Sequence, residues 1–187
     1  MKRLTEQQTE EILTMIWQEV SRASEKHPSW PADIIHGASI ICEEAGELMR
    51  AAVQYEREGG KRDEIKKEAI QVAATCIRFL QSSRIPLDSD RVLMTHRGIV
   101  TTLNALSQLP MYPAISRLDK GTDFITKASM VYTSSADIIS FCIHHPKDGL
   151  VRNTVLTTAS VAMLVIAAVN EGPMLQEFPR PTPPNIK

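Results

Sequence analysis

Apolar residues recur every three or four positions through most of this chain, and no stretch of useful length alternates between apolar and polar residues. Such a recurrence indicates amphipathic α-helices, whereas strict alternation would indicate half-buried strands. Only 5% of the residues are aromatic, while Ala, Ile, Leu and Met are plentiful, which favours helices packed on helices over a β-sandwich. The sequence therefore predicts an all-α fold, a helical bundle.

Prolines, glycines and capping residues divide the chain into predicted helices. Thr5 and Gln8 are placed to form a capping box at the start of the first helix, and Gly59 with Gly60 stops the second. Asp63 is the expected N-cap of the third helix. The predicted helices span about residues 6–26, 33–58, 63–83, 88–109, 122–143 and 150–170.

Three segments follow from this division. We expect residues 1–85 to form one helical unit, residues 86–170 a second half that packs on it, and residues 171–187 a Pro-rich tail. A faint internal repeat aligns residues 33–41 with residues 123–131, and both a duplication and a chance likeness between Ala- and Ile-rich helices explain it. In the repeat, Glu43, Glu44, Glu47 and Glu68 correspond to Thr133, Ser134, Asp137 and Thr157.

Composition excludes several classes of protein. The 21 basic and 22 acidic side chains leave a formal net charge of −1, so we expect no partner among polymeric nucleic acids. The three cysteines stand far apart, and the first residues are polar, so we expect a cytoplasmic protein without disulfides or a signal peptide. The most apolar run, residues 155–169, is shorter than the roughly 20 residues that span a bilayer, which favours a buried core helix and no membrane partner.

The densest acidic stretch contains Glu43, Glu44 and Glu47, which fall in one sector of a helix at about 100° per residue. Most charge runs are solvated faces in which cations three or four positions away relieve the repulsion. Neither Glu43 nor Glu44 has such a cation in its own helix, and Glu44 lies at the edge of the apolar stripe. Crowded, half-buried carboxylates without a counterion favour a metal site over a solvated face.

Glu68 lies at the edge of the apolar face of the next predicted helix, and Gln71 follows one turn later. If the two helices are antiparallel, the acidic stretch lies opposite these residues. Oxygen ligands of this kind suit Mg²⁺ or Mn²⁺ held jointly by protein and phosphate groups. The alternative for Glu68 is an ion pair with Lys66 or Lys67.

The order of these acids resembles a known family. Glu-Glu-x-x-Glu on one helix, followed about twenty residues later by Glu-Ala-Ile-Gln-Val-Ala-Ala, is similar to the MazG-like all-α nucleoside triphosphate pyrophosphohydrolases, which are related to the dimeric dUTPases. The resemblance covers about residues 28–82. Of the family pattern E-x-x-E and E-x-x-D, Glu44 and Glu47 match the first pair and Glu68 the third acid. Gln71 replaces the final Asp and leaves the site one anionic ligand short.

The resemblance implies an enzyme that hydrolyses a nucleoside triphosphate, with dNTPs as the first candidates, to the monophosphate and pyrophosphate. It implies that Glu44, Glu47 and Glu68 bind a Mg²⁺ or Mn²⁺ cofactor and are catalytic, with Glu43 as a secondary candidate that binds the metal or orients water. Relatives build their bundle from two protomers, so we expect a homodimer or a single-chain pseudo-dimer. The base and sugar of the substrate stay open.

Trp30, His36, Gln71 and Arg78 are the candidate substrate-binding residues. In the family, the segment before the acidic helix helps to wall the nucleotide site, and Trp30 and His36 lie there, although each is also a plausible core residue. Gln71 would make a neutral contact near the metal, and Arg78 either reaches a phosphate or lies in solvent. The alternative function is a catalytically silent bundle that binds nucleotide or a protein partner, which Gln71 and the acid-poor second half favour.

Overall fold

All regular structure in the described part of the chain is helical, as predicted. The computed structural model describes residues 5–82, 122–145 and 149–171, and no strand occurs among them. The helix predicted at residues 88–109 lies outside the described residues, as does nearly all of the Pro-rich tail. The helices are α1 (Glu6–Lys26), α2 (Ile34–Val53), the π-helix η1 (Gln54–Glu58), α3 (Arg62–Ser82), α5 (Phe124–His144) and α6 (Gly149–Asn170).

Helix boundaries follow the local signals with two differences. Thr5 and Gln8 form the predicted capping box of α1, in which the backbone nitrogen of Gln8 lies 3.1 Å from Thr5 Oγ1. The predicted N-cap at Asp63 is wrong, because α3 begins at Arg62 and Asp63 lies in its first turn, where its charge still suits the helix dipole. The π-helical turn after α2 was not predicted; it ends at Gly59, whose φ of 78° requires the left-handed region that glycine adopts freely.

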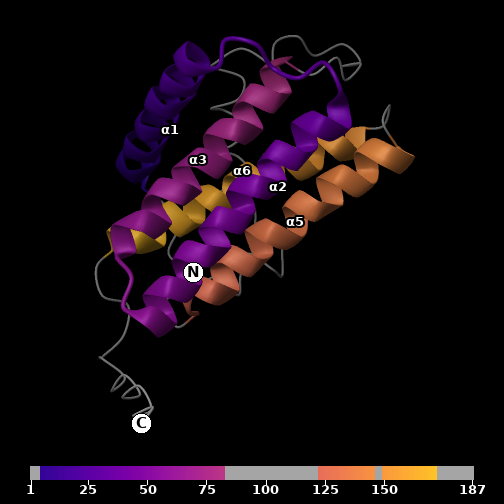
Figure 1. Cartoon of the computed structure of the whole chain (residues 1–187). Coiled ribbons are helices and arrows are strands. Elements are labelled where there is room, and N and C mark those ends of the chain that lie inside the picture. The colour runs from indigo at the N-terminus through magenta and orange to yellow at the C-terminus, as the bar shows by residue number, and fades with distance from the viewer. Residues whose placement is uncertain (1–4, 83–121, 146–148, 172–187) are drawn as a thin grey trace.

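Two antiparallel helix pairs, α2 with α3 and α5 with α6, make up the bundle (Figure 1). α2 packs against α5, and α3 packs against α6, so the two pairs face each other. α1 lies on the outside of this bundle and packs mainly against α3. Fully buried residues of the shared core include Ile16, Ile41, Leu48, Ile65, Ile77, Ile138 and Ile166.

α6 is the buried apolar helix that the sequence predicts. By length and composition it is a candidate to cross a membrane, but 67% of the apolar window is buried inside the bundle. Val155, Ala162 and Ile166, for example, are completely buried. The apolar surface of α6 is therefore used in packing against α3 and α5.

Burial along α2 predicts which of its isoleucines stabilises the fold. Ile41 is completely buried, whereas Ile35 near the start of the same helix is 42% exposed. We expect Ile41→Ala to lower the free energy of unfolding by about 2–5 kcal/mol, because it removes buried apolar atoms and leaves a cavity. Ile35→Ala is the matched control and should cost less than about 1 kcal/mol. Urea unfolding followed by circular dichroism measures both, and equal losses would contradict this assignment of the core face.

Candidate metal centre

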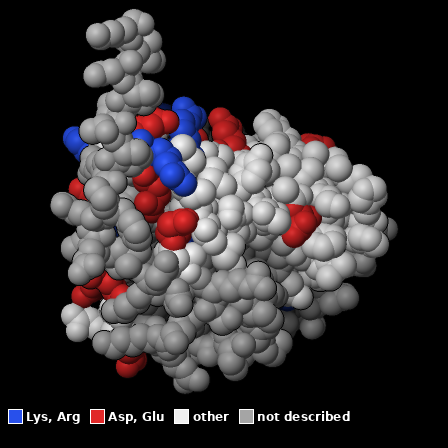
Figure 2. All heavy atoms as spheres, turned by 90° about the horizontal axis from the view of Figure 1, so that it is seen from below, with Lys and Arg blue, Asp and Glu red and all other residues white. Residues whose placement is uncertain are grey.

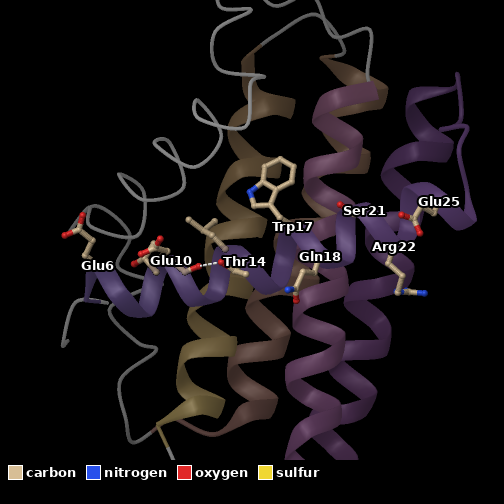
Figure 3. A pocket seen from close by; sticks show the side chains of 10 residues that line it. Glu6, Glu10, Thr14, Trp17, Gln18, Ser21, Arg22 and Glu25 are labelled. Carbon is tan, nitrogen blue, oxygen red and sulfur yellow. Dashed lines mark hydrogen bonds between the residues drawn. The ribbon is translucent and has the colours of Figure 1, made fainter.

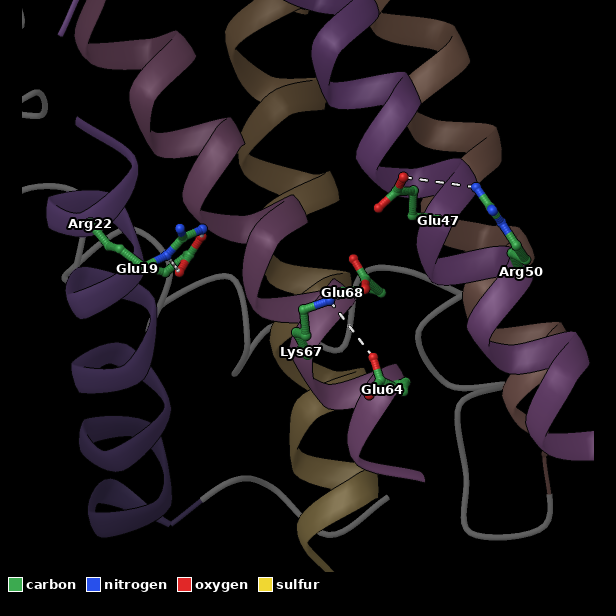
Figure 4. Close-up of polar contacts among 7 residues, drawn as sticks. All are labelled: Glu19, Arg22, Glu47, Arg50, Glu64, Lys67 and Glu68. Atoms are coloured by element: carbon green, nitrogen blue, oxygen red, sulfur yellow. Dashed lines mark hydrogen bonds and ion pairs between the residues drawn. The ribbon is translucent and has the colours of Figure 1, made fainter. Parts of the chain in front are cut away.

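Three glutamate carboxylates meet where α2 packs against α3. One oxygen from each of Glu44, Glu47 and Glu68 lies within 4.8 Å of the other two. Glu44 and Glu47 are half-buried, and Glu68 is buried, with 6% of its surface exposed. Figure 4 shows Glu47 on α2 and Glu68 on α3 facing one another between the two helices. The fold thus brings together the three residues that the sequence predicts as metal ligands.

Small buried residues follow two of the acids in the chain and are compatible with a close approach of the helices. Ala45 of α2 follows Glu44 directly, and Ala69 of α3 follows Glu68; both alanines are completely buried. Side chains of this size let two helix backbones lie near the short end of the usual interaxial distance of about 8–10 Å. Carboxylates at the edge of such a contact are forced toward each other. The apolar packing of the helix pair therefore positions the acids.

Several oxygen atoms of the cluster are buried without a hydrogen-bond partner among the described residues. They are Glu44 Oε2, Glu68 Oε2 and Gln71 Oε1. Leaving a buried acceptor unsatisfied costs about 1–3 kcal/mol, and more when the group is charged. Hard divalent cations coordinate oxygens of this kind. Three carboxylates with an amide oxygen nearby are a donor set that fits Mg²⁺ or Mn²⁺.

Two of the three carboxylates have a cation beside them (Figure 4). Arg50 lies 3.8 Å from Glu47, and Lys67 Nζ lies 2.8 Å from Glu68 Oε1, which is the contact that the sequence left open as an alternative. Both cations are more than half exposed, and ion pairs in such positions stabilise a protein by no more than about 1 kcal/mol. Glu44 makes no ion pair with any described residue. The negative charge of the cluster is therefore partly offset by cations at Glu47 and Glu68, but not at Glu44.

Glu44 is the carboxylate least able to carry its charge in this environment. Burial, followed by repulsion from Glu47, Glu68 and Glu43, raises the pKa of Glu44 from its ordinary 4.5 to about 7. Strongly shifted carboxylates of this kind gather at functional sites. A bound divalent cation would favour the charged form and remove the cause of the shift.

The other predicted residues on the acidic side lie around the three ligands. Gln71 follows Glu68 by one turn of α3, and its amide oxygen is buried. Glu43 is exposed on α2, and its charge contributes to the raised pKa of Glu44. His36 is exposed in the first turn of α2, where its backbone N–H donates to the capping carboxylate of Asp33.

Trp30 and Arg78 contact each other and fasten the start of α2 to the end of α3. The Arg78 guanidinium lies 5.0 Å from the centre of the Trp30 ring and donates to the backbone oxygen of His27 at 2.5 Å. Trp30 packs edge-on against Phe79, and its Nε1 would lie only 2.8 Å from a side chain added at Gly37. These contacts account for both residues through packing, the alternative that the sequence left open for Trp30.

An electrostatic influence of α1 on this cluster was not predicted from the sequence. Glu19 and Arg22 form a two-pronged ion pair, with N–O distances of 2.7 and 2.5 Å. Glu19 is among the groups that raise the pKa of Glu44, and Glu44 helps to raise the pKa of Arg22. A glutamate three residues before an arginine is visible in the sequence, but the spacing does not say which other helix the pair approaches.

A cavity of about 850 Å³ runs along the outer side of α1 (Figure 3). Its lining among the described residues comes from α1 alone and includes Thr14, Trp17 and Arg22. None of the three candidate ligands lines it. The cavity and the carboxylate cluster are therefore separate features.

Charged residues of both signs lie beside one another on the face shown in Figure 2. Much of the remaining described surface in that view is uncharged. A protein that binds polymeric nucleic acid carries an extended basic area instead. This face has no such area among its described residues.

The raised pKa of Glu44 predicts how the stability of the metal-free protein depends on pH. The folded state binds the Glu44 proton more tightly than the unfolded state, so this stabilisation is complete below about pH 4.5 and is lost as the pH rises through 7. Glu44→Gln keeps the neutral form at every pH. We therefore expect it to raise the melting temperature of EDTA-treated protein at about pH 8 by a few degrees, and to change it little at about pH 5.

Glu43→Gln is the matched control for this measurement, because Glu43 is the preceding residue and is exposed. It should shift the melting temperature much less at either pH. Scanning calorimetry across this range compares the three proteins. The same pH dependence in wild type and Glu44→Gln would contradict the raised pKa.

The geometry of the carboxylate cluster is the main guide to what this protein does. Comparisons with protein-family models, curated proteins and solved structures give no match for the chain. A functional assignment therefore depends on the chemistry of Glu44, Glu47 and Glu68 and on the sequence motif in which they occur.

Proposed function

We propose that this protein hydrolyses a nucleoside triphosphate, with dNTPs as the first candidates, to the monophosphate and pyrophosphate with Mg²⁺ or Mn²⁺. The observation that carries the proposal is the meeting of Glu44, Glu47 and Glu68, two of which have buried oxygens that no described residue hydrogen-bonds. The resemblance of residues 28–82 to the MazG-like pyrophosphohydrolases supports the same reaction. The order of the acids along the chain and their meeting in space are two separate arguments.

A divalent cation accounts for features of the cluster that a purely structural role leaves unexplained. A structural network of acids would supply each one with a cation or a donor, yet Glu44 has no ion pair with any described residue. It would also avoid burying carboxylate oxygens that lack a hydrogen-bond partner, as Glu44 and Glu68 do in the part of the chain that the structure describes. Three carboxylates leave part of the coordination sphere of Mg²⁺ for water and substrate phosphates, as in many phosphoryl-transfer sites.

The reaction requires positioning and charge stabilisation more than covalent chemistry from the protein. A water oxygen forms a bond to the α phosphorus while the bond from that phosphorus to the oxygen bridging to the β phosphate breaks. Pyrophosphate leaves with the bonding electrons, and the attacking water loses a proton. Mg²⁺, when bound, neutralises charge on the phosphates. We assign Glu43, exposed beside the ligands, to orient the water and accept its proton, and the amide of Gln71 to a neutral contact nearby.

We propose in addition that the second half of the chain is a built-in partner for the first. α2 and α5 begin alike, because Asp33 and Asp123 each accept from the backbone N–H three residues later. Ser39 and Ser129 each donate to the backbone oxygen three residues earlier. Buried positions also recur: Gly37, Ala38, Ile41, Ala45, Leu48 and Ala52 correspond to Lys127, Ala128, Val131, Ser135, Ile138 and Cys142.

The second half has a hydroxyl pair in the place of the acidic cluster. Thr158 Oγ1 donates to Ser134 Oγ at 3.0 Å across the contact of α5 with α6. By the same offset, Ser134 corresponds to Glu44 and Thr158 to Glu68, one residue beyond the Thr157 of the sequence alignment. Two neutral hydroxyl groups are much weaker ligands for a divalent cation than carboxylates are. This supports a single-chain pseudo-dimer with one metal site.

We therefore expect one divalent cation to bind per chain. Titration of the protein with Mn²⁺ in a calorimeter gives the stoichiometry and the dissociation constant. Glu68→Gln should weaken Mn²⁺ binding at least about tenfold, because it removes a ligand charge. Asp137→Asn, at the exposed counterpart of Glu47, should leave it unchanged. Two ions per chain, or undiminished binding by Glu68→Gln, would contradict the single site.

The reaction itself is tested by pyrophosphate release from a panel of NTPs and dNTPs with Mg²⁺ or Mn²⁺. We expect turnover that requires the metal and that falls at least about 100-fold in Glu44→Gln and Glu47→Gln, because the phosphates lose their bound counter-charge. Asp137→Asn is the control and should keep wild-type activity. Nucleotide binding without turnover, from a folded protein, would favour the catalytically silent bundle instead.

A further inference from the structure

Lys67 is the cation in closest contact with the candidate metal ligands among the described residues. Its Nζ lies 2.8 Å from Glu68 Oε1 and 3.7 Å from Glu64 Oε2. Figure 4 shows the Lys67 nitrogen between these two carboxylates. Arg50, the other cation beside a candidate ligand, lies 3.8 Å from Glu47, which is beyond hydrogen-bond distance. Lys67 therefore differs from Arg50 in that it donates a hydrogen bond directly to a ligand oxygen.

The two carboxylate oxygens of Glu68 have different surroundings. Oε2 is buried without a hydrogen-bond partner among the described residues, whereas Oε1 accepts from Lys67. Glu68 can therefore bind a divalent cation through Oε2 while Lys67 stays beside Oε1. At about 100° per residue, the completely buried Ile65 and Ala69 lie to one side of Glu68 on α3, and Lys67, 60% exposed, lies to the other. A nucleotide that enters from solvent thus meets this ammonium group beside the position of the metal.

The positive charge of Lys67 is not committed to Glu68 once a metal ion is bound. In the metal-free protein this charge partly offsets the buried carboxylate. A divalent cation on the same carboxylate offsets its charge more strongly, so the contact with Lys67 weakens. An ammonium group has three donors on a flexible stem, so it can turn to a phosphate oxygen without a movement of the helix. Glu64, which is not one of the three candidate ligands, keeps Lys67 near the site.

We propose that Lys67 exchanges Glu68 for a phosphate oxygen when metal and nucleotide bind, and so binds both the triphosphate and the pyrophosphate product. The inference rests on the proposed function and adds a phosphate-binding residue to the metal ligands. Lysine binds phosphate as a point charge. Pyrophosphate gains negative charge as it leaves, so an ammonium group at this place stabilises the transition state as well as the product. Before phosphate binds, Lys67 competes with the metal for Glu68.

Lys67→Gln should therefore change two affinities in opposite directions. For Mn²⁺ titrated into nucleotide-free protein, we expect the dissociation constant to fall about two- to fivefold, because the competing cation is removed. For inorganic pyrophosphate titrated into protein with excess Mg²⁺, we expect the dissociation constant to rise at least about tenfold, because a charged contact is lost. Lys67→Arg keeps the positive charge and should keep most of the pyrophosphate affinity. Calorimetry measures all of these affinities.

Lys66→Gln is the matched control, because it removes the same charge from the preceding residue. Lys66 makes no ion pair with any described residue, so both affinities should stay near those of wild type. Melting temperatures show whether each variant is folded. Unchanged pyrophosphate binding in Lys67→Gln would overturn the inference. Equal changes in Lys66→Gln would overturn it as an effect of net charge, and loss of both affinities in Lys67→Gln would overturn it as a structural effect.

Kinetics separate this inference from the proposed function. Loss of the phosphate contact in Lys67→Gln should raise the KM for the triphosphate and weaken inhibition by added pyrophosphate. A wild-type KM and wild-type inhibition in Lys67→Gln would overturn the role of Lys67 and leave the proposed function intact. Wild-type protein that neither turns over nucleotides nor binds pyrophosphate would overturn the proposed function and this inference together.

Discussion

The contact between α2 and α3 is the interaction on which the candidate site depends. Burial of apolar surface stabilises a protein by roughly 25 cal/mol per Å². In this helix pair it must exceed the repulsion among three carboxylates that lie within 4.8 Å of one another. The turn through η1 and Gly59 returns the chain so that Glu68 lies opposite Glu44 and Glu47. The hydrophobic core thus produces an electrostatic strain that a cation is suited to relieve.

Two cations beside the cluster reduce the repulsion among the three carboxylates without removing it. Arg50 and Lys67 offset charge at Glu47 and Glu68 while both cations stay largely exposed. Gln71 adds a buried oxygen but no further charge, which limits the repulsion in the metal-free protein and also limits the attraction for a metal ion. A site of this composition should therefore bind Mg²⁺ more weakly than one with four carboxylates, and under the proposed function the phosphates of the nucleotide would supply the remaining negative charge.

The two helix pairs differ in what lies between their helices. In the first pair the position between the helices is occupied by acids, and in the second by the hydrogen bond from Thr158 to Ser134. A satisfied neutral pair costs little to bury, whereas crowded carboxylates cost much more. The second pair can therefore serve as a stable support for the first. Its helix α6, which supplies many of the buried core residues, packs against α3, the helix that carries Glu68.

Local patterns in the sequence were enough to predict much of this protein. The helical periodicity, the capping box at Thr5 and the stop at Gly59 depend on residues near one another in the chain, so they could be predicted without the fold. The sector shared by Glu44 and Glu47 is likewise a property of one helix. The start of α3 at Arg62, one residue before the predicted N-cap, and the π-helical turn after α2 were not predicted from the local pattern.

Contacts between distant segments were decided only by the tertiary structure. The packing of α2 on α3 brought Glu68 to the other two acids and gave Glu44 its raised pKa, because burial and repulsion depend on what lies nearby in space. The same packing joined Arg78 to Trp30, and the separate packing of α1 on α3 brought Glu19 near enough to contribute to the raised pKa of Glu44. A sequence determines which face of a helix is apolar, but only the packed core determines which helices those faces meet.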